Sequence, residues 1–488
     1  MKMIILFYLS SLLILCLVEG DKIPKKKPGI KAVLSSRGIE YISQRIKDHF
    51  TSGFRSGISV PRFSRELPRK PTVCGQLDYK CEINVFNTRV THVSAPSVNL
   101  QLSSPHTVGF RTSGGSLELR GNWRKEDWAR RKKLNTGVFP WKWEWHPYVY
   151  ARWPAFHNGE YTCTARNFQI AVSAQLRKNG DALPELRDVS CSLTIGSFDM
   201  NFNVGKWSAA GNWANTALKG KIVGFVKPQF ERMACDMLLK QIKPLIAQGN
   251  AKLRETEQLT GALGLEDFEL NIRLLDEPVV RANSVSTAHV GEVKHKSGIK
   301  TPFEPSLLER SEDNSRMLYV LVSDYVFNSF FYKAVKSEDL SLKAGLSGPL
   351  SHLQVKPKPL KLTFNPASAE LETGAKFTVL GFNNRSEMVM AEVDLDADCV
   401  LSNLTIVGDK IQGSAVVEQV TVESIKPELA DKQLVSGLSN NIRKGIEDWV
   451  NKQLKNGLPL MVNIGKHLKQ PRFQFLHRTL EIGGDFVM

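Results

Sequence analysis

The chain has 488 residues and a formal net charge of +16. This length exceeds what one hydrophobic core organises, so a single compact domain is excluded and we expect two domains or three. The charge is divided unequally, because residues 1–300 carry +18 and residues 301–488 carry −2. A cationic front half indicates an anionic partner, such as nucleic acid, a glycan or an anionic lipid surface.

The first 20 residues are typical of a cleaved secretory signal. Lys2 precedes an apolar run from Met3 to Val18, and Glu19-Gly20 and a polar stretch follow. The run is shorter than the roughly 20 residues of a membrane-spanning helix, and no second apolar run approaches that length. We therefore expect a secreted protein, for which glycan or anionic lipid is a better partner than nucleic acid.

A short strand and an amphipathic helix are predicted next. Ile30 to Leu34 alternates like a strand, and Ser35 or Ser36 can cap a helix. Ile39, Ile42 and Ile46 then recur at spacings of three and four, which places them on one helical face. Packing within the domain explains this face, and contact with lipid would be an additional role.

An extended sheet and a long helix complete the front half. From about residue 81 to residue 224, apolar and polar residues alternate with a period of two, which predicts a large, twisted antiparallel sheet. A helix is predicted from Lys221 to Gln248, with Pro228 at its start or at a kink. A polar connection containing Pro302 and Pro305 leads to the back half.

The back half repeats this order. Met317 to Val335 reads as a strand, a cap at Ser323 or Asp324, and an amphipathic helix. Further strands follow, then a helix with apolar residues four apart, and then a final strand from Phe473 to Val487. Two halves with the same order of elements predict a pseudo-duplicated molecule.

The segment from Arg120 to Trp153 is the sharpest signal. It holds six of the nine tryptophans, and Arg120 to Lys133 carries a charge of +5. At a lipid interface, cations meet phosphates and indoles settle among the headgroups. Alternatively, these tryptophans cover the edge of the sheet with arginines stacked on them. Stacking on nucleic acid bases is chemically possible, but the secretory start argues against it.

No motif predicts catalysis or a metal site. The sequence contains no nucleophile elbow, no His-Glu-x-x-His and no phosphate-binding glycine loop, although a catalytic triad can assemble from distant positions. Asp394, Asp396 and Asp398 alternate on one strand and could bind calcium in principle. A solvated strand face is the preferred reading, because the other ligands of a calcium loop are missing.

Cysteines and sequons fit an oxidising compartment. Six cysteines follow the signal, and we expect them to pair, although six allow 15 connectivities. Five lie in the front half, so at least one of these pairs with Cys399 or stays free. Asn384 and Asn403 begin glycosylation sequons in the back half.

Several stretches together resemble one known family. They are "PGIKAVLSSRGIEYISQ" at Pro28, "SLELRGNW" at Ser116, Cys191 before "SFDMNFNV", Cys235 in the long helix, "RMLYVLVSDYVFNSFFY" at Arg316, "LTFNPA" at Leu362, "GLPLMV" at Gly457 and "LEIGGDFV" at Leu480. As a set they are similar to the family of bactericidal/permeability-increasing protein, lipopolysaccharide-binding protein and the plasma lipid-transfer proteins. The connection after "GNW" is longer than the family pattern, and Cys74, Cys81 and Cys163 have no family counterpart.

The resemblance implies an α+β fold shaped like a boomerang. Each half is a twisted antiparallel sheet wrapped on a long helix, with an apolar lipid pocket under it, and a central antiparallel sheet joins the two barrels. The resemblance also implies a disulfide between Cys191 and Cys235. Basic residues after "GNW" would form a tip that binds lipopolysaccharide.

We therefore expect a secreted, non-enzymatic lipid-binding protein that engages lipopolysaccharide or anionic phospholipid at a membrane surface, in antibacterial defence. The alternative is extracellular lipid transport, and a lipid-ester hydrolase is a remote one. We expect no cofactor other than bound phospholipid, no nucleic acid partner and a monomer. The expected segments are a signal at 1–20, a cationic barrel at 21–258, a central sheet and linker at 259–305, and a second barrel at 306–488 whose last strand returns to the central sheet.

The candidate site residues form two sets. The tip set contains Trp123, Arg124, Lys125, Trp128, Arg130, Arg131, Lys132, Lys133, Trp141, Trp143 and Trp145. The pocket set contains Ile39, Ile42, Ile46, Phe225, Phe230, Met233, Met237, Val322, Tyr325, Leu438, Ile442 and Ile446, and core packing explains each of these nearly as well.

Overall fold

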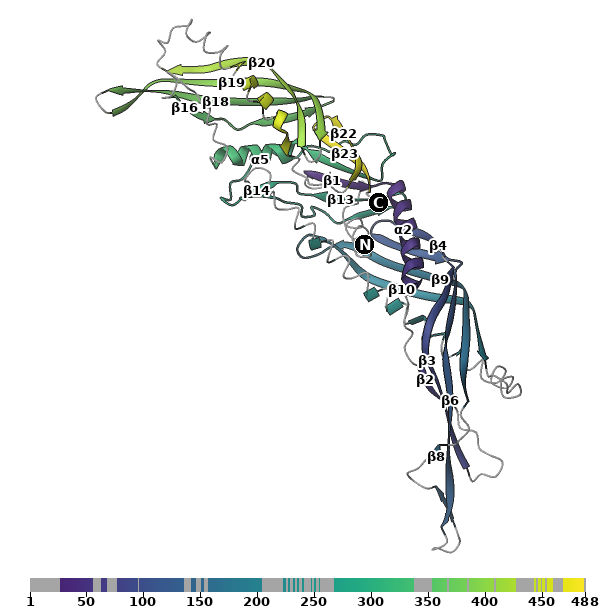
Figure 1. Ribbon diagram of the computed structural model, residues 1–488. Helices are drawn as coiled ribbons and strands as arrows, with labels where there is room; N and C mark the ends of the chain where they lie inside the picture. Colours follow the sequence, from purple (N-terminus) through teal and green to yellow (C-terminus); the bar gives the residue numbers. More distant parts are fainter. Residues whose placement is uncertain are drawn as a thin grey trace.

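The fold is α+β and elongated. Two curled antiparallel sheets lie at either end of a central sheet, and the molecule bends along its length (Figure 1). The computed structural model describes residues 27–55, 63–67, 77–94, 96–135, 142–145, 151–152, 157–203, 267–337, 353–366, 368–383, 386–407, 410–426 and 468–486, with parts of 223–254 and 443–459. Within these ranges, no helix combines the length and apolar character needed to cross a membrane.

The front sheet forms the first barrel. Its strands follow the order β2-β3-β6-β9-β5-β4, and β10 pairs with the other side of β9. Leu117 and Leu119 on β6 are buried while Arg120 is exposed, which is the alternation that predicted a half-buried sheet. The strands are β2 (Phe63–Leu67), β3 (Leu77–Ser94), β4 (Ser97–Ser103), β5 (Thr107–Ser113), β6 (Ser116–Asn135), β7 (Lys142–Trp145), β8 (Ala151–Arg152), β9 (His157–Lys178) and β10 (Pro184–Asn203).

The central sheet joins sequence-distant segments in the order β12-β13-β1-β15-β23-β22. Its core consists of β1 and β15, which pair antiparallel with Ile30 opposite Val322 and Leu34 opposite Leu318. The strands are β1 (Ile30–Leu34), β12 (Val279–Arg281), β13 (Ser284–His289), β15 (Leu318–Ser323), β22 (Leu468–Leu476) and β23 (Thr479–Phe486). A small separate sheet pairs β11 (Phe268–Leu270) with β14 (Val293–His295).

The back sheet forms the second barrel, with the order β16-β18-β19-β20-β21 and β17 beside β18. Leu395, Ala397 and Cys399 on β19 are buried, and the alternate residues lie on the outer side. The strands are β16 (Leu353–Pro357), β17 (Lys361–Asn365), β18 (Ser368–Asn383), β19 (Ser386–Val407), β20 (Lys410–Lys426) and β21 (Leu458–Pro459).

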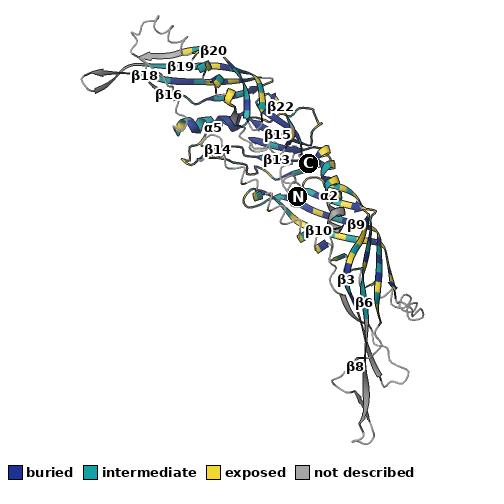
Figure 2. Ribbon diagram, viewed as in Figure 1, coloured by how far each residue is buried: buried dark blue, intermediate teal, exposed yellow. Residues whose placement is uncertain are grey.

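Each half places a helix directly after its central strand, as the sequence predicts. α2 (Ser36–Arg55) follows β1, and Ser35 caps it because its Oγ accepts a hydrogen bond from the Gly38 N–H at 3.3 Å. α5 (Asp324–Lys336) follows β15, and Ser323 caps it by accepting from the Tyr325 N–H. Figure 2 shows α5 as a mostly buried helix. The two equivalent strand–helix units therefore meet at the centre of the molecule.

Two further helices close the barrels. The described residues within 223–254 are helical and are called the front helix, and those within 443–456 are called the back helix. Cys235 of the front helix forms a disulfide with Cys191 on β10, which confirms the expected pair. The positions of the long helices in the sequence are thus correct.

The expectation that all six cysteines pair is wrong. Cys163 and Cys399 are free and buried. Cys163 lies among the buried residues of the front barrel and Cys399 among those of the back barrel, so the two thiols cannot meet. Cys74 and the side chain of Cys81 fall outside the described residues.

Two elements differ from the sequence predictions. The expected single final strand is a hairpin of β22 and β23, with Arg478 at a positive φ of 54° in its turn. The expected connection after Trp123 is instead a continuation of β6 to Asn135, which pairs with β3 as far as Arg131 and with β7 from Lys132 onward. Main-chain pairing with β3 extends the strand although its charged sequence lacks apolar alternation.

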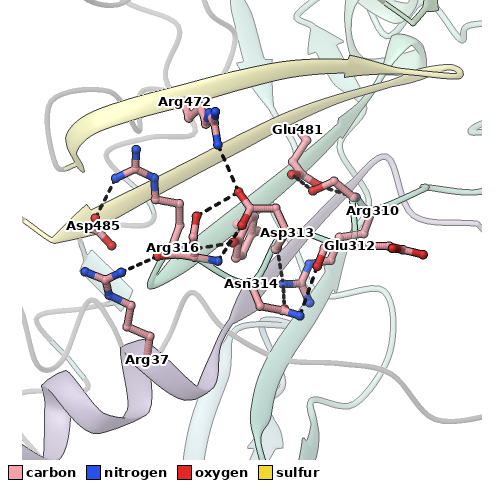
Figure 3. Close-up of polar contacts among 12 residues, drawn as sticks. Arg37, Arg310, Glu312, Asp313, Asn314, Arg316, Arg472, Glu481 and Asp485 are labelled. Atoms are coloured by element: carbon pink, nitrogen blue, oxygen red, sulfur yellow. Dashed lines mark hydrogen bonds and ion pairs between the residues drawn. The ribbon is translucent and has the colours of Figure 1, made fainter.

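A polar network attaches the connection before β15 to the central sheet (Figure 3). Asp485 on β23 accepts from Arg316 Nη1 at 2.9 Å and from the Met317 N–H at 3.1 Å. Arg37 at the start of α2 donates to the Ser315 carbonyl at 2.8 Å, and Glu481 on β23 accepts from the Ser311 N–H at 2.8 Å. The beginning of α2 and the end of the chain are thereby held on the same segment.

Candidate functional site

The base of the candidate site is a buried aromatic cluster in the front barrel. Trp123 on β6 is only 2% exposed and packs edge to face on Phe202 of β10, with ring centroids 5.4 Å apart. Tyr161 on β9 packs on the other side of Phe202 and shares a hydrogen bond with the Thr88 hydroxyl. Burial raises the pKa of Tyr161 to about 12, so its hydroxyl stays neutral at physiological pH.

Beyond Trp123, β3 and β6 continue as a narrow extension, in which β2 pairs with β3 and the short strands β7 and β8 pair with β6. We call it the tip ribbon and define it as residues 77–84, 124–135, 142–145 and 151–152. It projects from the front sheet as the thin end of the molecule (Figure 1). The pairing is regular, from Asn84 opposite Arg124 to Leu77 opposite Arg131. A long ribbon with few strands offers both of its faces to a partner.

The register divides the predicted cations between the two faces of the tip ribbon. Alternate residues of a strand lie on opposite faces. The even positions of β6 hold Arg124, Arg130 and Lys132, whereas the odd positions hold Lys125, Arg131 and Lys133. The pairing thus places three of the six cations at even positions and three at odd positions of one strand.

The tryptophans of the tip ribbon lie at defined positions relative to these cations. β7 pairs with the end of β6 so that Trp145 is opposite Lys132 and Trp143 is opposite Leu134. Trp143 and Trp145 are alternate residues of one strand, as the sequence predicts. In the strand pairing, Trp128 is opposite Lys80 of β3 and opposite Arg152 of β8. Sequence reasoning missed Lys80 and Arg152, because only strand pairing brings them to Trp128.

Trp123 requires a correction. We expected its ring to contact lipid at the tip, but it belongs to the buried core of the front barrel and lies at the base of the ribbon. The reason is that β6 presents odd positions to the interior there, as it does at Leu117 and Leu119. Trp141 and the side chains of the other tip residues beyond Arg124 lie outside what the structure describes.

The pocket residues that are described lie in the core that runs from the front barrel through the central sheet to the back barrel. Ile42, Val322 and Tyr325 are buried, and Ile39 and Ile46 pack half-buried against the same core. Ile446 of the back helix packs against this core as well. Phe225, Phe230, Met233, Met237, Leu438 and Ile442 lie outside the described residues.

Lys358 forms ion pairs with two of the three aspartates on the acidic strand face of the back barrel. Lys358 Nζ lies 2.7 Å from Asp394 Oδ1 and 2.8 Å from Asp396 Oδ1. Asp398 is exposed at the next alternate position. No group of three potential ligands that could hold a metal ion occurs in the described part of the chain. The arrangement is that of a solvated strand face.

The two sequons fall on different parts of the chain. Asn403 is exposed on β19 at a positive φ of 52°, where the pairing with β20 shifts register. Its amide is accessible for glycosylation. Asn384 is outside the described residues.

Comparison with known proteins finds similarity to one family. A sequence model described as "LBP / BPI / CETP family, C-terminal domain" matches residues 266–346 and 350–488. Bactericidal permeability-increasing protein of Sebastes schlegelii is 20% identical over 419 residues, 84% of this chain and 78% of that protein. Lipopolysaccharide-binding protein of Mus musculus is 21% identical over 327 residues, 66% of this chain and 58% of that protein.

The fold agrees with these matches. The crystal structure of lipopolysaccharide binding protein superposes with a TM-score of 0.53 at 15% identity, covering 94% of this chain and 99% of that chain. The fold is therefore that of the elongated two-barrel proteins with a central sheet. These findings bear out the resemblance to the family of bactericidal/permeability-increasing protein, lipopolysaccharide-binding protein and the plasma lipid-transfer proteins that the sequence motifs indicate.

Proposed function

We propose that this protein is a secreted lipid-binding protein that engages anionic lipid, either lipopolysaccharide or phospholipid, through the tip ribbon. Similarity to this family supports lipid as the ligand, because relatives are named for binding lipopolysaccharide. The observation that carries the assignment to the ribbon is its register. Trp145 stands opposite Lys132, and Trp128 stands between Lys80 and Arg152, so indoles and cations alternate across neighbouring strands.

This alternation matches the two parts of a lipid headgroup region. Lysine and arginine near an anionic surface each contribute about 1 kcal/mol to attraction, and the attraction decreases with salt. Tryptophan settles at the depth of the headgroups, where its ring is half in an apolar medium. Because cations lie on both faces of the ribbon, the ribbon can insert between headgroups and meet phosphates on either side.

The acyl chains would enter the apolar interior of the barrels, beside Ile42 and the core around α5. This role needs no covalent step, so the protein acts as a binding protein and not as an enzyme. Binding of bacterial lipopolysaccharide outside the cell would place the protein in antibacterial defence.

The test replaces Arg130, Arg131, Lys132 and Lys133 with serine. Binding to immobilised lipopolysaccharide should weaken at least about tenfold at low ionic strength, and the residual binding should depend less steeply on salt. The matched control replaces four exposed cations outside the ribbon, Arg166, Arg281, Lys294 and Lys300, with serine, and it should bind nearly as the wild type. Unchanged binding of the ribbon variant at low salt would contradict the assignment of the ribbon.

Lipid transport is distinguished by a second measurement. Native mass spectrometry of the purified protein should show co-purified phospholipid, and the protein should move a labelled phospholipid between vesicles if transport is its role. Binding of lipopolysaccharide without transfer would favour defence. Protein that is empty, binds no lipopolysaccharide and transfers no lipid would contradict the proposed function.

A further inference from the structure

Each barrel has an edge strand that is bonded to a helix. Alternate residues of an edge strand direct both backbone groups away from the sheet, and these groups need partners. In the front barrel the edge is β10, and in the back barrel it is the part of β20 beyond its short pairing with β21. In both cases the described partners include side chains of the long helix. We call these contacts the front seam and the back seam.

The back seam is a polar stripe on the back helix. Arg443, Glu447 and Asn451 are four residues apart and share one helical face. Arg443 Nη2 donates to the Val417 carbonyl at 2.7 Å, and Glu447 Oε2 accepts from the Val417 N–H at 3.4 Å. The Asn451 amide bridges the backbone of Ala415, accepting from its N–H at 2.8 Å and donating to its carbonyl at 2.9 Å.

The front seam has equivalent contacts, except that a disulfide takes the place of one hydrogen-bonded side chain. Glu231 Oε1 accepts from the Ile195 N–H at 3.3 Å, which corresponds to Glu447 and Val417 in the back seam. One helical turn later, the front helix has Cys235, bonded to Cys191 of β10, where the back helix has Asn451. Asn250 Nδ2 then donates to the Pro184 carbonyl at 2.9 Å. The front seam is therefore locked, whereas the described contacts of the back seam are hydrogen bonds.

Apolar residues lie directly behind the back seam. Val450 and Leu454 of the back helix are buried there, together with Cys399 and Leu401 of β19. On the outer side, Val416 lies between the two bonded residues of β20 and is 50% exposed. A lipid chain that approaches this edge thus meets an exposed valine first and the apolar interior next.

We infer that the back barrel opens at its seam to admit acyl chains, whereas the disulfide prevents the front barrel from opening at the equivalent seam. The inference rests on the proposed lipid-binding function. Opening the back seam breaks the side-chain hydrogen bonds described above and separates Val450 and Leu454 from the core, where an entering acyl chain would replace them. Separating β19 from β20 would instead break a main-chain ladder that pairs residues 392–407 with residues 410–426. Opening at the back seam therefore costs less free energy than opening between β19 and β20.

Labelling of two buried cysteine thiols measures the opening of each barrel in the absence of lipid. Cys399 lies behind the back seam, and Cys163 lies in the locked front barrel. Labelling with N-ethylmaleimide at pH 8, with mass spectrometry to assign each cysteine, should modify Cys399 faster than Cys163. Asn451→Ala should accelerate labelling of Cys399 about tenfold, and the rate for Cys163 should not change.

The control is a second asparagine that makes the same kind of bridge. Asn328 of α5 bridges the N–H and carbonyl of Leu362 on β17, at 2.6 and 2.8 Å, in the same half of the molecule. Asn328→Ala lowers the stability of the molecule without touching the seam, so it should leave the ratio of the Cys399 rate to the Cys163 rate near that of the wild type. If it raises this ratio as much as Asn451→Ala does, or if Asn451→Ala has no effect, the inference is overturned. Should Asn451→Ala fail to fold, Asn451→Asp, which keeps the acceptor for the Ala415 N–H, replaces it.

A second experiment measures the uptake of lipid from vesicles that contain a self-quenched fluorescent phosphatidylglycerol. Asn451→Ala should raise the rate of lipid uptake about tenfold with little change in the amount bound at equilibrium. Wild-type protein that takes up no lipid would contradict the proposed function itself. Wild-type uptake that Asn451→Ala leaves unchanged, while Cys399 labelling accelerates, would overturn the seam as the lipid entrance.

Discussion

His289 in the central sheet is a buried neutral imidazole. Its Nε2 contacts the Thr287 hydroxyl and its Nδ1 contacts the Ile272 carbonyl at 2.6 Å, so both ring nitrogens have partners inside the protein. Burial lowers the pKa of His289 from 6.5 to about 4, and the contact with the Ile272 carbonyl opposes this only in part. The residue is opposite Ile30 of β1, at the junction of the front half and the linker.

The pKa of His289 predicts a loss of stability in acid. The unfolded chain binds a proton near pH 6.5 but the folded chain only near pH 4, so the free energy of unfolding decreases as the pH falls through this window. The full effect corresponds to about 3 kcal/mol. Urea unfolding at pH 7.5, 6, 5 and 4 should show a shallower pH dependence in His289→Gln than in the wild type. Exposed His92→Gln should retain the wild-type slope, and equal slopes in all three proteins would contradict this account.

Hydrogen bonds from the side chains of α5 connect this helix to several neighbouring segments. Asn328 joins it to β17 through Leu362, and Ser329 Oγ accepts from the Val293 N–H of β14 at 3.0 Å. Lys333 is buried and donates to Glu292 Oε1 at 2.6 Å and to the Val293 carbonyl at 2.7 Å. The helix therefore supplies the hydrogen bonds that neighbouring strands would otherwise lack.

Removing the Asn328 amide should destabilise the protein markedly. Asn328→Ala leaves the N–H and carbonyl of Leu362 buried without their partner, and each unsatisfied buried group costs about 1 to 3 kcal/mol. We expect a decrease of about 3 kcal/mol in the free energy of unfolding, measured by chemical denaturation. Asn314→Ala, in an exposed loop, should change it by less than about 0.5 kcal/mol. A small effect at Asn328 would mean that water replaces the amide.

How well the sequence predicts an element depends on which interactions build it. β1, β15, α2 and α5 were predictable because Ser35 and Ser323 are caps and because apolar residues such as Ile42 and Val322 follow the period of their element. The end of β6 was not predictable, because from Arg124 to Asn135 main-chain pairing extends it through residues that no burial pattern marks. The split of the last strand depends on Arg478, whose positive φ gives no signal in the sequence.

In the candidate site, too, some features were predictable from the sequence and others depend on strand pairing. Charge and tryptophan content marked Arg120 to Trp153 as a candidate site, because composition is visible in the sequence. The burial of Trp123 and the pairing of the candidate residues are consequences of register, which places Trp123 opposite Val85 inside the barrel and Lys132 opposite Trp145. The sequence did not indicate the back seam. Arg443, Glu447 and Asn451 form an ordinary polar helical face, and only the structure shows that they contact Ala415 and Val417.

At the scale of the whole molecule, two similar halves meet in one sheet. β1 and β15 are neighbours in that sheet, each leads into a capped helix, and each barrel is bonded to a long helix along its edge strand. The halves differ in charge and in their cross-links. The Cys191–Cys235 disulfide belongs to the front barrel, and the back barrel's Cys399 is a free thiol. Similar folds with different cross-links should respond differently to a reductant.

Reduction should therefore destabilise the front half selectively. The disulfide closes a segment with a sequence separation of 44, for which the loss of chain entropy on cross-linking corresponds to about 4 kcal/mol of stability. With dithiothreitol, hydrogen exchange at β9 and β10 should accelerate by a large factor, because opening of these strands becomes less costly. Exchange at β19 and β20 should change little, since their contacts with the back helix are untouched. Equal acceleration in both halves would show instead that the central sheet couples them into one cooperative unit, and Cys191→Ala/Cys235→Ala without reductant should then reproduce that result.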